Sequence, residues 1–387
     1  MRVLYVNHTS VVGGGERSLI DLLECVREVA SAEVACPPGP LADAVRRLRL
    51  NVREIRGTDV SFRLHPVQTP SGLARMGAAS VEVGVVLRGR SFDVVHANST
   101  RSGLIAAPGA VLGSTPLVVH VRDALPPGPL AAITSAVIGT AASVVLANSE
   151  YTARSFTRNG GRERVRVVHN QVDSLRFDPA RVDRSRTRSE LGIADEETVI
   201  GIVGQITPWK AQDDAVRILA DVRRRGVEAR LLVVGRPQFV GGAERYDNSR
   251  FLDAVRRLVT ELGVADSVLF LGERQDVREI LAALDVLIVP SWEEPFGRVV
   301  LEAMSMGVPV IATNVGGPAE IVRDGEDGIL LPPRRPSQWG EAVSALLSDP
   351  ERRSVIGRRA RATVEGRFNP ERHLAGVLGV YREAISA

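Results

Sequence analysis

The chain of 387 residues contains a single lysine, Lys210, although lysine and arginine together number 49. It has two cysteines, Cys25 and Cys36, and no CxxC pair, so the sequence gives no sign of a disulfide framework. Aromatic residues make up only 4%, and the formal net charge is +3. Nucleic-acid-binding proteins gather basic residues on one face with aromatic side chains between them. We therefore expect no nucleic-acid partner.

The sequence also lacks any stretch approaching 18 continuous apolar residues, which argues against a transmembrane helix. The first residues, 1–7, have the pattern of a β-strand and not that of a signal peptide, so we expect a cytoplasmic protein. The segment 41–50 carries Leu41, Val45 and Leu48 with arginines between them. This pattern fits either a peripheral contact with an anionic membrane surface or an ordinary solvated helix.

Short apolar runs alternate with longer helical patterns along the whole chain. Continuous apolar strands separated by helices are typical of a parallel sheet covered on both faces, the doubly wound α/β class. The predicted strands are 3–6, 94–95, 117–121, 144–146, 165–168, 199–203, 231–234, 268–271, 286–289 and 308–312.

A polar, charged stretch over residues 176–197 separates two such series. We place the domain boundary near residue 190, which gives an N-terminal domain over 1–190 and a C-terminal domain over 191–369. The last helical pattern, about 370–387, is expected to pack back on the first domain. In open α/β sheets ligands bind at the carboxyl ends of the strands, so functional residues should lie in loops just after strands.

The first such loop holds Gly13, Gly14 and Gly15, between the first strand and an amphipathic helix. Glycines allow close backbone approach, and a helix N-terminus offers free N–H groups to an anion such as phosphate. The pattern is not GxGxxG, and a simple tight turn explains the glycines equally well.

The lone lysine lies in the second loop, after strand 199–203. An ammonium group with three donors is suited to a diphosphate, whereas the alternative is an exposed lysine at a helix start.

The third loop follows strand 286–289 and leads into a helix that begins near Phe296 and Gly297. Glu294 precedes this helix, and Glu302 lies inside it among apolar residues, which a solvated surface charge would not explain. The helix start suits a diphosphate, and the two carboxylates suit hydroxyl groups of a sugar and a ribose. A second glycine turn, Gly316 and Gly317, follows the next predicted strand.

At these residues the chain resembles the retaining glycosyltransferase family 4, which has the GT-B fold. The likeness covers nearly the whole chain and is strongest over 199–327. Residues 294–304 resemble the E-x7-E motif of the family, residues 307–317 continue it, and residues 269–277 resemble its loop beside the nucleotide base. Residues 168–173 resemble its N-G-V-D segment. The resemblance implies two Rossmann-like doubly wound domains facing a central cleft.

The resemblance also implies roles for individual residues. Lys210 would bind the diphosphate, Glu294 the hydroxyls of the donor sugar, and Glu302 the ribose, whereas Gly14 and Gly15 would approach the phosphate or sugar through their backbone. The other residues expected at the donor are Gln205, Arg274, Phe296, Gly297, Arg298 and Val299. The family uses no metal, and the absence of a DxD motif agrees with that, so no cofactor is expected.

Two positions depart from the family pattern. Gln205 stands where the family usually has arginine, which removes a cation from the diphosphate site. Arg122 stands where the family usually has a histidine, and His120 is two residues earlier on the same strand face. Either His120 or Arg122 could face the sugar, and Arg122 could supply the missing cation.

The sequence therefore predicts a glycosyltransferase that moves a sugar from a nucleotide donor to a hydroxyl acceptor with retention of anomeric configuration. A UDP-sugar is the expected donor and a GDP-sugar the alternative. Three other hypotheses stay open: a GT-B nucleotide-sugar epimerase, a Rossmann oxidoreductase, and a degenerate nucleotide-sugar-binding protein. A lipid, a polysaccharide or a small natural product could be the acceptor. The distinctive N-terminal residues Arg46, Arg47, Arg49, Arg53, Phe62 and Arg63 match nothing specific.

Overall fold

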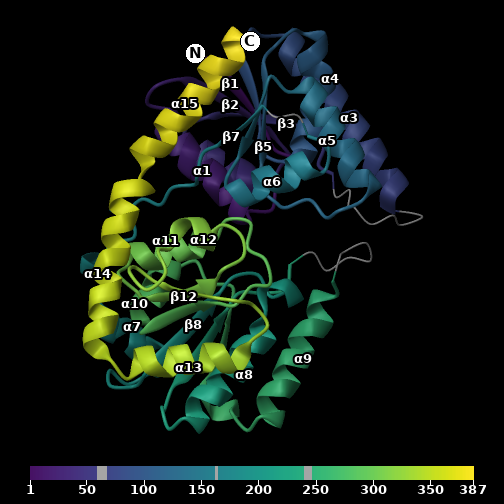
Figure 1. Ribbon diagram of the computed structural model, residues 1–387. Coiled ribbons are helices and arrows are strands. Elements are labelled where there is room, and N and C mark those ends of the chain that lie inside the picture. The colour runs from purple at the N-terminus through teal and green to yellow at the C-terminus, as the bar shows by residue number, and fades with distance from the viewer. Residues whose placement is uncertain (59–67, 162–163, 239–245) are drawn as a thin grey trace. The chain divides into compact units, whose positions relative to one another are not determined.

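The computed structural model describes residues 1–58, 68–161, 164–238 and 246–387, so Phe62 and Arg63 lie outside the described residues. It divides the chain into two compact units (Figure 1). Unit 1 comprises Met1–Gln171 and Pro370–Ala387, and unit 2 comprises Val172–Asn369. Each unit is one parallel sheet with helices on both faces, as the alternating pattern predicts. Both ends of the chain lie in unit 1.

The sheet of unit 1 has seven strands in the order β3-β2-β1-β4-β5-β6-β7, all parallel in their pairings. The strands are β1 (Arg2–Val6), β2 (Ser31–Cys36), β3 (Asn51–Glu54), β4 (Val94–Ala97), β5 (Leu117–Val121), β6 (Val144–Ala147) and β7 (Val165–Val167). The chain order reverses beside β1, between β1 and β4, which makes the carboxyl ends of these two strands the switch point where ligands bind in this class of fold.

Helices cover both faces of this sheet. One face carries α1 (Gly14–Val26), α2 (Pro40–Arg47) and α15 (Pro370–Ser386). The other carries α3 (Gln68–Arg88), α4 (Thr100–Leu112), α5 (Pro129–Ala141) and α6 (Glu150–Arg158). The residues of the inner strands β1, β2, β4, β5 and β6 are almost all buried, which explains why these strands are largely apolar, whereas the edge strands β3 and β7 are more exposed.

The sheet of unit 2 has six parallel strands in the order β10-β9-β8-β11-β12-β13. The strands are β8 (Val199–Val203), β9 (Arg230–Val234), β10 (Val268–Gly272), β11 (Val286–Val289), β12 (Val310–Thr313) and β13 (Ile329–Leu331). The helices are α7 (Arg184–Glu190), α8 (Gln212–Arg224), α9 (Asn248–Glu261), α10 (Val277–Ala283), α11 (Arg298–Ser305), α12 (Pro318–Ile321), α13 (Pro336–Leu347) and α14 (Pro350–Arg367). Here the switch point lies between β8 and β11.

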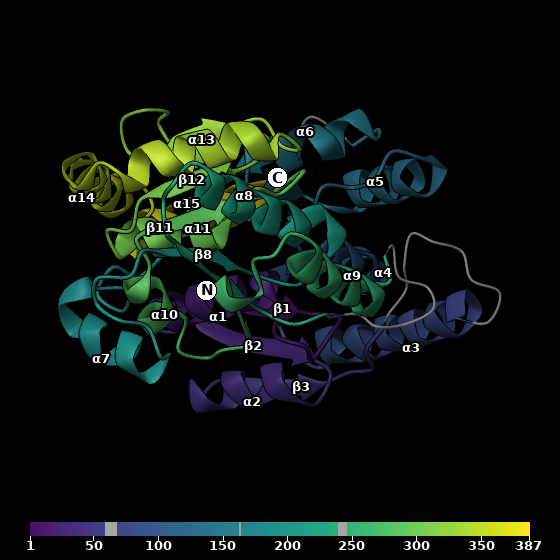
Figure 2. The same ribbon diagram turned by 90° about the horizontal axis from the view of Figure 1, so that it is seen from below.

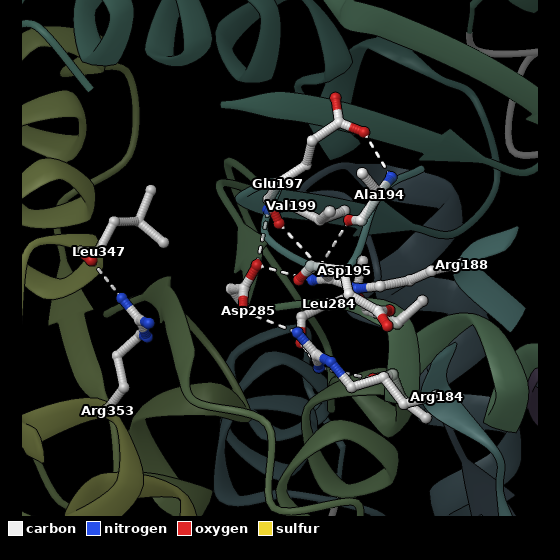
Figure 3. A network of polar contacts seen from close by, with 12 residues as sticks. Arg184, Arg188, Ala194, Asp195, Glu197, Val199, Leu284, Asp285, Leu347 and Arg353 are labelled. Carbon is white, nitrogen blue, oxygen red and sulfur yellow. Dashed lines mark hydrogen bonds and ion pairs between the residues drawn. The ribbon is translucent and has the colours of Figure 1, made fainter. Parts of the chain in front are cut away.

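The division between the units falls after residue 171 and not near 190, because α7 and the segment around it are fixed to unit 2. Arg188 is buried and donates one hydrogen bond to the carboxylate of Asp285 at 2.9 Å and another to the carbonyl of Ala283 at 3.0 Å (Figure 3). Arg184 binds the same carboxylate at 2.8 Å. The charged segment thus contains a polar network built on the buried Arg188, and it is anchored to unit 2 rather than acting as a linker.

The apolar residues of α2 are not available to a membrane surface. Leu41 and Val45 are fully buried in the core of unit 1, and Leu48 packs against that core. On the exposed side Arg46 pairs with Asp43 and Glu54. The arginine-rich pattern of 41–50 is therefore that of an ordinary surface helix, which corrects the membrane interpretation of this segment. Among the helices in the described part of the chain, none is long and apolar enough to cross a bilayer.

Candidate functional site

The loop after β8 holds Lys210 in a fixed conformation. A single 3₁₀ turn, Pro208–Lys210, follows the strand, and Ala211 then takes a left-handed conformation (φ 58°) before α8 begins. The buried side chain of Gln212 donates to the carbonyl of Gln205 at 2.9 Å and accepts from the N–H of Thr207 at 3.3 Å. Both ends of the loop are thereby tied to the start of α8, so the lysine does not sit on a free helix start.

Lys210 and Glu294, which are 84 positions apart, form an ion pair at the carboxyl ends of β8 and β11. The two side chains are 17% and 7% exposed. Ser291 donates to the same carboxylate oxygen at 3.2 Å, and the ammonium group lies 4.4 Å from the ring centre of Trp209. The structure thus brings together the two residues for which the sequence predicts diphosphate and sugar binding.

The glycine turn after β12 closes against the backbone of Glu294. The N–H of Gly317 donates to the carbonyl of Glu294 at 2.8 Å. A Cβ atom at Gly316 would lie 2.0 Å from that carbonyl oxygen, and a Cβ atom at Gly317 would lie 2.2 Å from the carbonyl oxygen of Phe296. Real Cβ atoms do not approach so closely, so both positions require glycine. These two residues hold Glu294 in place.

Helix α11 begins at Arg298, close to the predicted position, and Gly297 before it has a left-handed conformation (φ 92°). Arg298 donates to Glu302 at 3.3 Å, one turn along the same helix, and both side chains are only partly exposed. Phe296 is buried in the hydrophobic core and Val299 packs against it. Any contact of Phe296 with a ligand would therefore have to come from its backbone.

Two residues that the sequence analysis expects at the sugar donor form side-chain hydrogen bonds within the protein. The Gln205 side chain donates to the carbonyl of Gln238 at 3.4 Å. Arg274 makes a two-point contact with Asp276, at 2.8 Å and 2.5 Å, and this hydrogen-bonded pair lowers the pKa of the Asp276 carboxyl. The pairing fixes the loop after β10, where the sequence places the base-binding segment.

In unit 1 the glycine-rich loop leads into α1, and the carboxylate of Glu16 caps the start of this helix. Glu16 accepts a hydrogen bond from the N–H of Gly13 at 3.1 Å and another from Asn7 at 3.3 Å. Burial raises the pKa of the Glu16 carboxyl, while these hydrogen bonds and the nearby charge of Arg122 act in the opposite direction. The loop is therefore packed against the ends of β1 and β5 and is more than a simple turn.

Arg122 stands directly beside this loop. A Cβ atom at Gly15 would lie 3.2 Å from its Cδ atom. The Arg122 guanidinium donates to the carbonyl oxygen of Asn98 at 3.1 Å, to the side-chain oxygen of Asn98 at 2.9 Å, and to that of Asn170 at 3.1 Å. These bonds to amide and carbonyl oxygens orient the guanidinium beside the glycine-rich loop.

His120 occupies a different environment, although it precedes Arg122 by only two residues. It is fully buried, and its Nδ1 atom lies 3.4 Å from Nε2 of His96. His96 in turn contacts the hydroxyl of Tyr381 in α15 at 2.8 Å, and Tyr381 donates to Tyr5 at 3.0 Å. Burial, together with the Arg122 charge, keeps the pKa of both histidines well below the usual range. The enclosed position of His120 does not fit direct contact with a sugar, so Arg122 is the residue of the two that meets the loop.

Several residues of these sites have no role in the sequence analysis. Ser291 and Trp209 flank the Lys210–Glu294 pair, and Asn98 and Asn170 hold Arg122. For Ser291, Trp209 and Asn98 the only sequence signal is that each follows a predicted strand, whereas Asn170 also lies in the segment 168–173 that resembles the N-G-V-D segment of the family. Within the described residues, no three His, Cys, Asp or Glu side chains are arranged to hold a metal ion.

Comparison with known families gives two matches that divide the chain. Residues 183–363 match the family described as "Glycosyl transferases group 1", and residues 12–176 match "Glycosyltransferase Family 4". A D-inositol 3-phosphate glycosyltransferase of Acidothermus cellulolyticus is 33% identical over 339 residues, 82% of this chain and 73% of that protein. One of Nocardia farcinica is 37% identical over 247 residues, 62% of this chain. The match with this second relative spans 52% of the relative's length, about half.

Among solved structures, the Anabaena protein Alr3699/HepE in complex with UDP-glucose is 26% identical, with a TM-score of 0.84 and 99% of both chains covered. A glycosyltransferase from Rickettsia africae has a TM-score of 0.83 at 18% identity, covering 99% of this chain and 98% of its own. At 18% identity, the similarity to the Rickettsia protein is evidence for the fold and not for the function. Together these neighbours identify the pair of parallel-sheet units as the GT-B fold that the resemblance implies.

Proposed function

This chain belongs to glycosyltransferase family 4, and from that premise we propose that it transfers a sugar from a nucleotide donor to an acceptor hydroxyl, with retention of anomeric configuration. A UDP-sugar is the donor that we propose, because the HepE structures hold UDP and UDP-glucose. The relatives named as D-inositol 3-phosphate glycosyltransferases make a phosphorylated polyol the first acceptor to test.

The observation that carries the proposal is the ion pair of Lys210 and Glu294 at the switch point of unit 2. This point lies beside the start of α11, which no side chain caps, and the start of a helix suits a phosphate. We assign the diphosphate to Lys210 and to the start of α11, the sugar hydroxyls to Glu294, and the ribose hydroxyls to Glu302. Carboxylates bind hydroxyl groups well because a charged acceptor strengthens the hydrogen bond.

We assign Gly14, Gly15 and Arg122 to the same donor by the family resemblance. The orientation of Arg122 by Asn98 and Asn170 supports this assignment, because it fixes a guanidinium beside Gly15, and a guanidinium is suited to a phosphate. Arg122 would then compensate for Gln205, which stands where the family usually has arginine. Gln205, Arg274, Arg298 and the backbone of Phe296, Gly297 and Val299 complete the proposed donor site.

The proposed mechanism is a front-face displacement. The bond between the anomeric carbon and the diphosphate oxygen breaks, the acceptor oxygen bonds to the same face, and the leaving diphosphate takes the acceptor proton. Lys210, Arg122 and the helix start stabilise the developing negative charge. Glu294 and Glu302 bind hydroxyls, and neither acts as a nucleophile.

The test is to incubate the protein with UDP-glucose, UDP-N-acetylglucosamine or GDP-mannose, with and without an inositol phosphate, and to measure nucleotide release and products by NMR. We expect release of UDP that depends on the acceptor, and a product with the anomeric configuration of the donor. Inversion would rule out the mechanism. Isomerisation of donor without acceptor would identify an epimerase, and binding without any turnover would favour a nucleotide-sugar-binding protein.

A further inference from the structure

One surface of unit 1 is unusually apolar. Of the 14 large hydrophobic residues that are exposed in the described part of the chain, eight lie on the three helices α3, α4 and α5. Unit 2 contributes only Leu175 and Leu262 to the 14. Scattered exposed apolar residues are normal, but such a concentration marks an interaction surface.

The three helices lie side by side on one face of the sheet, with α4 in contact with both α3 and α5 (Figure 2). Helices α3 and α4 approach closely at two glycines, because a Cβ atom at Gly109 would lie 3.1 Å from the Cα atom of Gly84. Val81 and Val85 are four residues apart on α3 and therefore share one side of that helix. They are 68% and 62% exposed.

The exposed residues of α4 and α5 extend this surface. Val111 and Leu112 at the end of α4 are 59% and 77% exposed, and Ile133 and Val137 share one side of α5. Helix α5 contains no charged residue over its whole length. Such helices are apolar on both sides, a pattern typical of helices that are buried in a larger assembly.

Few charges interrupt this surface. The three helices contain three arginines and one acid, Glu82. Glu82 pairs with Arg56 at 3.2 Å and also accepts the backbone N–H of Arg56, so it is held beside the end of β3. Nothing on the surface offers an acidic partner for a basic protein.

We propose that the surface formed by α3, α4 and α5 binds the same surface of a second copy of this chain. Two copies related by a two-fold axis present identical patches to each other, which suits a surface that is apolar and weakly charged. Small residues among the exposed positions, such as Gly77 and Ala136, allow helices of two copies to approach as closely as α3 and α4 do.

The area is sufficient for such an interface. Complete burial of a Val, Leu or Ile side chain removes roughly 60–120 Å² from water, and these eight side chains are partly buried already, so together they offer on the order of 500 Å². Two copies would therefore bury about 1,000 Å² through these side chains alone, the lower limit of a specific interface. Alanine, glycine and proline residues between them add to this area.

A membrane surface fits less well. Membrane-surface helices combine a strongly basic polar side with Trp, Phe or Leu on the apolar side. Helices α3, α4 and α5 contain no aromatic residue and no lysine. Their eight large exposed apolar residues are four valines, three leucines and one isoleucine, interspersed with alanine and glycine.

Sedimentation velocity over a wide range of protein concentration tests the proposal. The wild-type chain should form a species of twice 41.7 kDa that dissociates on dilution. Leu112→Glu should weaken this association at least tenfold, and Val81→Glu combined with Ile133→Glu should abolish it, because each buries an unpaired charge in the proposed interface. Val29→Glu is the matched control: Val29 is 56% exposed but lies after α1, and this variant should associate like the wild type.

Circular dichroism on each variant separates loss of association from loss of fold. A wild-type chain that stays at 41.7 kDa at all concentrations would overturn the proposal. So would association that is equally strong in folded Leu112→Glu. Flotation with vesicles of phosphatidylcholine and phosphatidylglycerol completes the test: a monomer that floats with vesicles and loses this property on Leu112→Glu would replace the second copy with a membrane.

Discussion

The two units have the same architecture but differ strongly in their content of histidine, lysine and tryptophan. All six histidines lie in the sequence of unit 1, whereas the single lysine and all three tryptophans lie in unit 2. In unit 2 the cation at the switch point is paired with a carboxylate, Lys210 with Glu294. In unit 1 the cation Arg122 is held by the oxygens of Asn98 and Asn170. A ligand anion that binds Lys210 must therefore compete with Glu294.

The largest effect is expected from Lys210→Ala. Removal of a preorganised cation that stabilises a leaving diphosphate should lower kcat by about 10²–10³-fold. Nucleotide release from the donor is the measurement, and Arg257→Ala, which truncates an exposed side chain on α9 of the same unit, is the control. Near-wild-type kcat in Lys210→Ala would show that the diphosphate is neutralised elsewhere, with Arg122 as the next residue to test.

Acid should destabilise unit 1 before unit 2. Burial lowers the pKa of His8 to about 3 and keeps the pKa of His96 and His120 well below 6.5. As the pH falls through 6.5 the unfolded chain takes up protons at these three positions and the folded chain does not, so stability is lost. From pH 7 to 5.5 the loss is roughly 4 kcal/mol, at about 1.4 kcal/mol per histidine for each full pH unit below 6.5.

Two spectroscopic signals can follow the units separately. Tryptophan fluorescence reports on unit 2 alone, because Trp209, Trp292 and Trp339 all lie there, whereas far-UV circular dichroism reports on both units. We expect the midpoint of thermal unfolding by circular dichroism to fall with pH more steeply than the midpoint by fluorescence. Coincident shifts would show that the two units unfold together in one cooperative transition. Their stabilities could then not be compared separately.

The glycines of the two sites should differ in their tolerance of a methyl group. In Gly317→Ala the new Cβ atom would meet the backbone of Phe296, which cannot move aside, so we expect a loss of about 2 kcal/mol in stability. In Gly15→Ala it would meet only the side chain of Arg122, and the loss should stay below about 1 kcal/mol. Urea unfolding followed by tryptophan fluorescence measures the first and by circular dichroism the second. Equal losses would contradict the view that only the site of unit 2 is built on close backbone contacts.

The sequence predicts the centre of each sheet better than its margins. Ten apolar runs correspond to strands, whereas β2, β3 and β13 were not predicted. Strands β3 and β13 are short strands at sheet edges, and β2 carries Glu33, whose carboxylate is buried only because Arg53 and Arg90 bind it at 2.8 Å each. A charge that is compensated by residues 20 and 57 positions away leaves no local signal.

The same reason explains the misplaced boundary, and it explains why the sequence alone leaves the choice between His120 and Arg122 open. Arg188 and Asp285 are 97 positions apart, so the charged segment 176–197 is read as a linker although it is anchored to unit 2. The strand pattern places His120 and Arg122 on one face, which is correct, but it cannot predict that Tyr381 of α15 encloses the histidine network through His96. By contrast, Lys210 and Glu294 could be paired from the sequence, because the carboxyl ends of parallel strands meet at one edge of the sheet.

The smallest effect is expected from Glu294→Gln, which tests whether Glu294 competes with the diphosphate for Lys210. In Glu294→Gln the ammonium group of Lys210 loses its anionic partner, and the site loses a negative charge beside the diphosphate. We therefore expect UDP to bind about fivefold more tightly, even though sugar transfer falls, since a carboxylate that repels the diphosphate has been removed. Quenching of tryptophan fluorescence can follow the titration, because Lys210 lies 4.4 Å from the ring centre of Trp209. Glu326→Gln, which removes an exposed acid of the same unit, should leave UDP affinity unchanged. Weaker binding in Glu294→Gln would mean that the carboxylate holds the lysine in its binding position, and that the ion pair persists when the donor is bound.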